Sequence, residues 1–161
     1  VSTKSNRSEL DSHADTCCAG INTVPFAYSE ETVSVSPFID DYSPLKVVKI
    51  ASVVTAYDDP ITGDTLFLVI HEALYFGAKL QQTLLNPNQL RAHGNKVHEV
   101  PKQFDIDSKH AIKIPHRDLM LPLGLDGIIS CLLTCKPTPE EMKDFRAQPQ
   151  ESWIELNSDV A

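Results

Sequence analysis

A short acidic segment near the amino terminus carries the residue types that acid–base chemistry needs. It runs from Leu10 to Asp15 and reads Leu-Asp-Ser-His-Ala-Asp. Leu10 is suited to the end of a buried strand, which would place Asp11 at the strand end, where its side chain can reach a cleft. Ser12 supplies a hydroxyl that can hold a neighbouring carboxylate or backbone group. An isolated Asp-Ser pair is also typical of turns and helix caps, so the rest of the chain must decide between the two interpretations.

This segment resembles the active-site segment of retroviral-type, or retropepsin-like, aspartic proteases, whose pattern is Leu-Asp-Thr/Ser-Gly-Ala-Asp. Five of the six positions match, and the exception is His13, where the family has glycine. The resemblance implies that Asp11 is the catalytic acid and base and that Ser12 braces the catalytic pair. It also implies that His13, Ala14 and Asp15 contact the substrate, and that neither a cofactor nor a metal takes part.

The chemistry of such proteases requires two carboxylates that share one proton and one water. Two close carboxylates cannot both ionise, so one serves as acid and the other as base. The six-residue pattern occurs once in the 161 residues. Asp11 would therefore have to meet its own copy across a two-fold axis, which makes the expected active form a homodimer acting on a polypeptide substrate.

A second informative stretch follows later in the chain. Asn86 is a good N-cap, Pro87 a good first helical residue and Gly94 a good terminator, so the sequence predicts a short helix at about 87–93. An aliphatic pair, Leu84-Leu85, directly precedes this helix.

The same stretch resembles the protease region of copia-type retrotransposon polyproteins. That region has a tyrosine-rich strand, a Leu-Leu pair and a helix with a Gln-Leu pair, and the order and spacing match Ala73–Gly77, Leu84-Leu85 and Gln89-Leu90. The resemblance implies that the Leu-Leu pair lies behind the catalytic turn. Arg91 on the helix is then a candidate ion-pair partner for Asp15.

Alternating apolar residues and β-branched runs predict strands through most of the chain. Separate strands are expected at 65–71 and 73–76. The apolar run from Leu119 to Leu133 suits a hairpin or two interface strands, and an exposed patch of that size is unusual on a monomer. We therefore expect this run to form much of the dimer interface.

An earlier hairpin, roughly 33–50, lies where a retroviral-type protease has its flap. A flap closes over an extended peptide and supplies backbone hydrogen bonds. This hairpin carries Pro37 and Pro44 and has no glycine at its tip. An ordinary surface hairpin is the alternative interpretation.

The fold implied by the resemblance is all-β: a closed, barrel-like retropepsin-type domain over residues 8–135 with one short helix. Residues 136–161 are assigned to a C-terminal tail or linker, and Trp153–Leu156 resembles the linker that follows the protease in such polyproteins. Within the tail, Thr138 and Glu141 form a capping box that predicts a helix, which Pro149 must end.

Composition narrows the function classes. The net charge of −8 argues against nonspecific binding to nucleic acid or to an anionic membrane. The absence of an 18-residue apolar run or a secretory leader predicts a cytoplasmic protein with reduced thiols. Two alternatives to the protease stay open: a catalytically silent dimerising or peptide-binding module, and a metal-binding domain using His13, Cys17 and Cys18.

Overall fold

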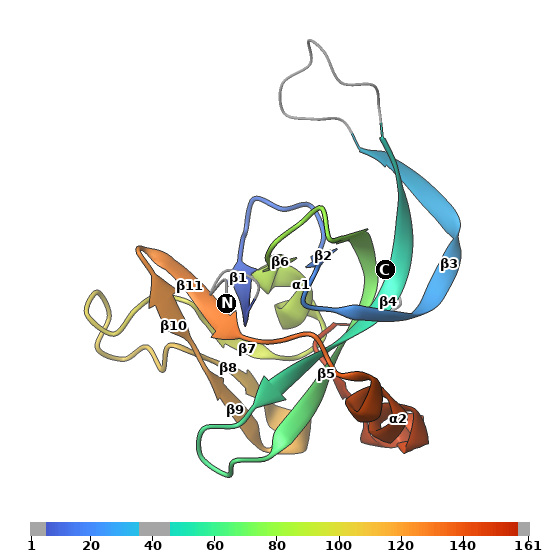
Figure 1. Ribbon diagram of the computed structural model, residues 1–161. Helices are drawn as coiled ribbons and strands as arrows, with labels where there is room; N and C mark the ends of the chain where they lie inside the picture. Colours follow the sequence, from blue (N-terminus) through green and yellow to red (C-terminus); the bar gives the residue numbers. More distant parts are fainter. Residues whose placement is uncertain (1–5, 36–45, 158–161) are drawn as a thin grey trace.

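The computed structural model describes residues 6–35 and 46–157, which form two β-sheets and two α-helices (Figure 1). Within these ranges the larger sheet has nine strands in the order β10-β11-β1-β6-β2-β5-β4-β3, with β12 paired to β5. In chain order its strands are β1 (Arg7–Leu10), β2 (Cys18–Gly20), β3 (Val24–Val35), β4 (Lys46–Asp58), β5 (Thr65–Gly77), β6 (Thr83–Leu85), β10 (Gly124–Asp126), β11 (Ile129–Leu133) and β12 (Ile154–Glu155).

The smaller sheet follows the first helix along the chain. It has the order β7-β8-β9, and its strands are β7 (Lys96–His98), β8 (Ala111–Ile114) and β9 (Leu119–Pro122). The helices are α1 (Pro87–Ala92) and α2 (Pro139–Ala147), and two short 3-10 turns are η2 (Pro115–Arg117) and η3 (Gln150–Ser152). The expected all-β class is thus confirmed, and both predicted helices form.

The two faces of β5 are buried in different clusters. Leu68 and Ile70 belong to the main core, whereas Phe67 and Val69 pack in a second cluster with α2. Successive side chains of a strand point to opposite faces, so burial of both faces explains why this stretch of β5 is apolar without alternation.

The C-terminal segment covers the second face of the sheet. Met142 and Phe145 of α2 are buried, and the Phe145 ring lies 5.2 Å from Phe26 and 5.3 Å from Trp153. The capping box between Thr138 and Glu141 forms as predicted, so the helix begins at a fixed point. Residues that the sequence assigns to a tail or linker therefore pack against the sheet.

The last described residues continue this attachment. Leu156 is fully buried in the main core and its N–H donates to the carbonyl of Val69. The side chain of Asn157 accepts from the His71 N–H and donates to the His71 carbonyl. The segment compared with a linker is thus an extra strand on β5.

A buried polar network ties β1 to its neighbours. Asn22, in the turn after β2, donates through Nδ2 to the carbonyl of Arg7 and to Thr134 Oγ1, both at 2.9 Å. Its Oδ1 accepts from the hydroxyl of Thr83 in β6, and Ser8 of β1 shares a hydrogen bond with Thr134. Strands β1 and β6 and the end of β11 are thereby held through one amide.

Two expectations about strands need correction. Residues 65–77 form one strand rather than two. The pairing of this strand with β4 shifts register where Glu72 takes a left-handed φ of 48°, and the strand continues beyond that residue. The closed barrel is absent from the described residues: β10 and β3 end the larger sheet, and the long β3–β4 hairpin extends away from the β10–β11 hairpin (Figure 1). The prolines and tip of the expected flap lie outside the described residues.

We expect Phe145→Ala to destabilise the domain by about 3–5 kcal/mol, because it leaves a cavity under three aromatic neighbours. Urea unfolding gives the free energy of unfolding for the variant. Phe104→Ala is the matched control, since that ring is 72% exposed and its removal should cost little. Equal stability of the two variants would show that α2 is a detachable tail.

Candidate functional site

Asp11 lies immediately after the end of β1, between two strands from distant parts of the chain. Strand β1 pairs in parallel with β6, where Leu10 is level with Leu85, and antiparallel with β11. The Asp11 N–H continues the parallel ladder by donating to the carbonyl of Leu85 at 2.9 Å. The backbone of Asp11 is therefore fixed by the sheet, and the Leu-Leu pair lies behind the turn as the resemblance implies.

The turn after Asp11 closes on the aspartate itself. The His13 N–H donates to Asp11 Oδ1 at 2.9 Å, a local side-chain-to-backbone bond typical of aspartate turns. Asp11 is half-buried, whereas Ser12, His13 and Asp15 are exposed. His13 thus contacts Asp11 through its backbone and presents its imidazole to solvent.

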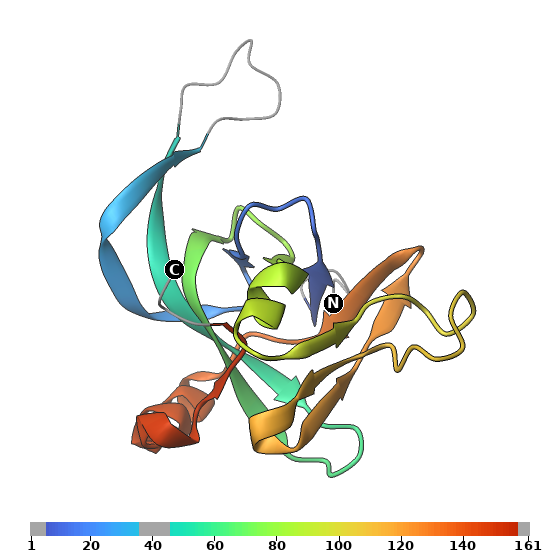
Figure 2. The ribbon, with the colours of Figure 1, turned by 180° about the vertical axis from the view of Figure 1, so that it is seen from behind.

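Helix α1 holds the second half of the loop. The Asn86 side chain caps the helix by accepting from the N–H groups of Asn88 and Gln89, and its Nδ2 donates to the carbonyl of Ala14. Gln89 accepts from the Cys17 N–H at 3.1 Å and donates to Thr16 Oγ1 at 3.0 Å. The loop is thus anchored to the helix that begins next to β6 (Figure 2).

The thiols behind the loop are poorly ionised. Burial raises the pKa of Cys17 to about 11, although a hydrogen bond from the Asn86 N–H partly opposes the shift. Burial also raises the pKa of Cys18, with further contributions from the negative charges of Asp11 and Asp15. Both aspartates therefore lie close enough to Cys18 to act on it electrostatically.

The structure does not gather His13, Cys17 and Cys18 into a metal site. In residues 6–35 and 46–157, no group of three or more His, Cys, Asp or Glu side chains is placed to hold a metal ion. Cys17 is fully buried whereas His13 is exposed. Because one side chain is buried and the other is exposed, His13 and Cys17 do not converge, although they lie close together in the sequence.

The expected pair between Arg91 and Asp15 is wrong. Arg91 Nη2 lies 3.2 Å from Glu99 Oε1, and it also donates to the carbonyl of Val97. The arginine therefore binds the segment after α1 and holds β7 to the helix. Thr16 and Gln89 also belong to the site, although the sequence did not indicate them. A contact between side chains of distant segments leaves no local pattern in the sequence.

An exposed apolar edge lies beside Asp11. Because Glu9 is level with Cys131 in the antiparallel pair, Asp11 lies near the Ile129 end of β11. Ile128 is 92% exposed and Ile129 is 42% exposed. Other members of the Leu119–Leu133 run, such as Leu121 and Leu132, are fully buried within the chain. The run is thus divided between the core and the surface next to Asp11.

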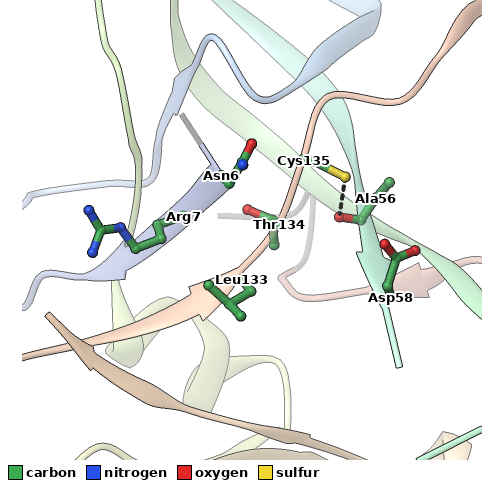
Figure 3. A pocket seen from close by; sticks show the side chains of 7 residues that line it. All are labelled: Asn6, Arg7, Ala56, Asp58, Leu133, Thr134 and Cys135. Atoms are coloured by element: carbon green, nitrogen blue, oxygen red, sulfur yellow. Dashed lines mark hydrogen bonds between the residues drawn. The ribbon is translucent and has the colours of Figure 1, made fainter. Parts of the chain in front are cut away.

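A cavity of about 420 Å³ lies at the opposite end of β1 (Figure 3). It is lined by Asn6, Arg7, Ala56, Asp58, Leu133, Thr134 and Cys135. The lining contains one carboxylate, Asp58, which accepts a hydrogen bond from Thr65. The cavity therefore offers no pair of carboxylates for acid–base chemistry and is separate from the loop at Asp11.

The comparisons with family models, with curated proteins and with solved structures find no match. No helix in the described ranges is long and apolar enough to cross a membrane.

The thiol environment gives a direct test of this loop packing. A pKa of about 11 leaves about a hundredfold less thiolate at pH 8 than the ordinary value of 9.0. We expect iodoacetamide to modify Cys17 slowest in the folded protein, with a rate that rises as the pH approaches 11. Cys18, only partly buried, should react faster. Mass spectrometry locates the label, and faster labelling of Cys17 than of Cys18 would contradict the described loop.

Proposed function

We propose that this chain is an aspartic endopeptidase domain of the retropepsin-like type that processes a retrotransposon polyprotein. The observation that carries the proposal is the placement of Asp11 at the end of β1, bonded to β6, in a loop anchored by the helix that follows β6. The two stretches that resemble the family in sequence are thus in contact in space.

Asp11 and its copy from a second chain would act as the acid–base pair. The ionised carboxylate removes a proton from a bound water, the water oxygen attacks the scissile carbonyl carbon, and the protonated carboxyl gives its proton to the carbonyl oxygen. Breakdown of the tetrahedral intermediate then needs a proton delivered to the leaving nitrogen.

The loop leaves the acidic group accessible, which peptide hydrolysis requires. Asp11 is half-buried, and Ser12, His13 and Asp15 are exposed around it. Strands β3 and β4 rise on the same side of the molecule as the loop in both views (Figures 1 and 2). This is the arrangement that the proposal requires of a hairpin that contacts a peptide bound at Asp11.

The exposed apolar residues beside Asp11 supply a surface for the second chain. Ile128, Ile129 and Leu125 lie on the β10–β11 hairpin with at least 41% of their surface exposed. Burial of apolar surface drives association. The register of β1 and β11 places the tip of this hairpin next to Asp11. An interface at the tip would therefore bring the two aspartates towards the two-fold axis of the dimer.

Asp11→Asn should abolish cleavage of an unfolded protein substrate, because an amide can neither accept nor donate the required proton. Activity of the parent should be highest at acid pH, where one carboxyl of the pair stays protonated. The measurement is cleavage of denatured casein between pH 3 and 8. Asp144→Asn, on the exposed face of α2, is the matched control and should behave as the parent. Unchanged cleavage by Asp11→Asn would sink the proposal.

Only dimers should turn over, so the specific activity should fall on dilution. We expect Ile128→Arg to weaken the dimer and lower activity at micromolar concentration without unfolding the monomer, since this side chain is 92% exposed. Ile61→Arg, in the β4–β5 turn with 80% exposure, is the control. Sedimentation measures the assembly. A monomer that cleaves in proportion to its concentration would rule out a shared pair, and a dimer without cleavage would favour the silent module.

A further inference from the structure

Gln89 of α1 bonds to the Asp11 loop through its side chain. It lies one helical turn after the N-cap and is half-buried. Its amide uses both ends on neighbouring loop residues: Oε1 accepts from the Cys17 N–H, and Nε2 donates to Thr16 Oγ1. One planar group therefore fixes a backbone position and a side-chain position of the loop together.

The opposite end of the loop is fixed by the same rigid unit. The Asp11 N–H is bonded to Leu85 of β6, and Asn86, the next residue, caps α1 and donates to the Ala14 carbonyl. Leu85, Asn86 and Gln89 thus contact the start, middle and end of the loop. Because strand and helix are continuous in the chain, the three anchors keep fixed positions relative to one another.

The anchors matter for chemistry because the loop itself is exposed. Ser12, His13 and Asp15 are on the surface, and the bond from His13 to Asp11 is internal to the loop. A displacement of the reacting groups by about 1 Å can lower a catalytic rate by about 100-fold. Loss of the Gln89 contacts would release the segment that joins Asp15 to the buried Cys17.

We propose that Gln89 is a positioning residue for Asp11, acting through Thr16 and Cys17 and not by contact with substrate. This inference rests on the proposed function. It separates two effects: the geometry of the catalytic pair depends on Gln89, whereas the proposed peptide contacts of the β3–β4 hairpin do not. Its loss should therefore lower kcat more than it changes KM.

The decisive variant is Gln89→Met, which keeps the length of the side chain and removes both hydrogen bonds. We expect kcat to fall by about 10- to 100-fold with KM within about threefold of the parent. Gln89→Glu should restore much of kcat, because a carboxylate accepts from the Cys17 N–H and from the Thr16 hydroxyl.

Two further measurements separate positioning from general damage. Exchange of the Cys17 amide with deuterium, followed by NMR, should be faster in Gln89→Met than in the parent, while amides of β4 and β5 keep their protection. Gln103→Met makes the same chemical change at an exposed site between β7 and β8 and should alter neither kcat nor exchange.

The outcomes distinguish this inference from the proposed function. If the parent cleaves, Asp11→Asn does not, and Gln89→Met retains the parental kcat, the inference is overturned and the proposed function stands. Slow Cys17 exchange in Gln89→Met would likewise overturn it. If neither the parent nor the Asp144→Asn control cleaves, the proposed function fails, and the positioning role fails with it.

Discussion

A single buried amide, that of Asn22, links strand β1 to groups on both of its neighbours in the sheet. The amide is 1% exposed and binds the Arg7 carbonyl, the Thr134 hydroxyl and the Thr83 hydroxyl. These groups belong to or adjoin β1, β11 and β6, and both threonines are buried. A buried donor left without a partner costs about 1–3 kcal/mol, so the network favours one register of the three strands. The position of Asp11 follows from that register.

The exposed loop and its anchors resolve two opposing demands. A group that reacts with a peptide must be open to solvent, and it must also hold its geometry. Here Asp11 is half-buried and Asp15 is exposed, while the backbone of the loop is hydrogen-bonded to β6 and to the N-cap of α1. All of these anchors come from one short stretch, residues 83–89, so a single continuous unit supports the site.

The sequence predicted the features whose causes are local. Asn86 and Pro87 set the start of α1, Thr138 and Glu141 set the start of α2, and alternation located most strands. The aspartate turn was also predictable, because its bonds join residues two positions apart. Such signals require only neighbours in the chain.

Features that depend on pairing between distant residues could not be predicted in the same way. The pairing of β12 with β5 depends on the packing of Leu156 in the main core. The ion pair between Arg91 and Glu99 depends on the path of the chain through β7. The barrel expectation failed for a similar reason, since closure is decided by the order of strands rather than by their number. The contacts of Gln89 with Thr16 and Cys17 join positions more than 70 residues apart.

The strand order also determines when the site can exist during synthesis. Ser8 of β1 bonds to Thr134, 126 residues later, and β6 arrives only after the hairpins of β3, β4 and β5. Contacts of such long sequence separation form slowly, because loop closure must precede them. Until the ribosome has made β11, Asp11 has no partner strand on that side of β1. The surroundings of Asp11 are therefore complete only after a strand more than a hundred residues later in the chain has been made.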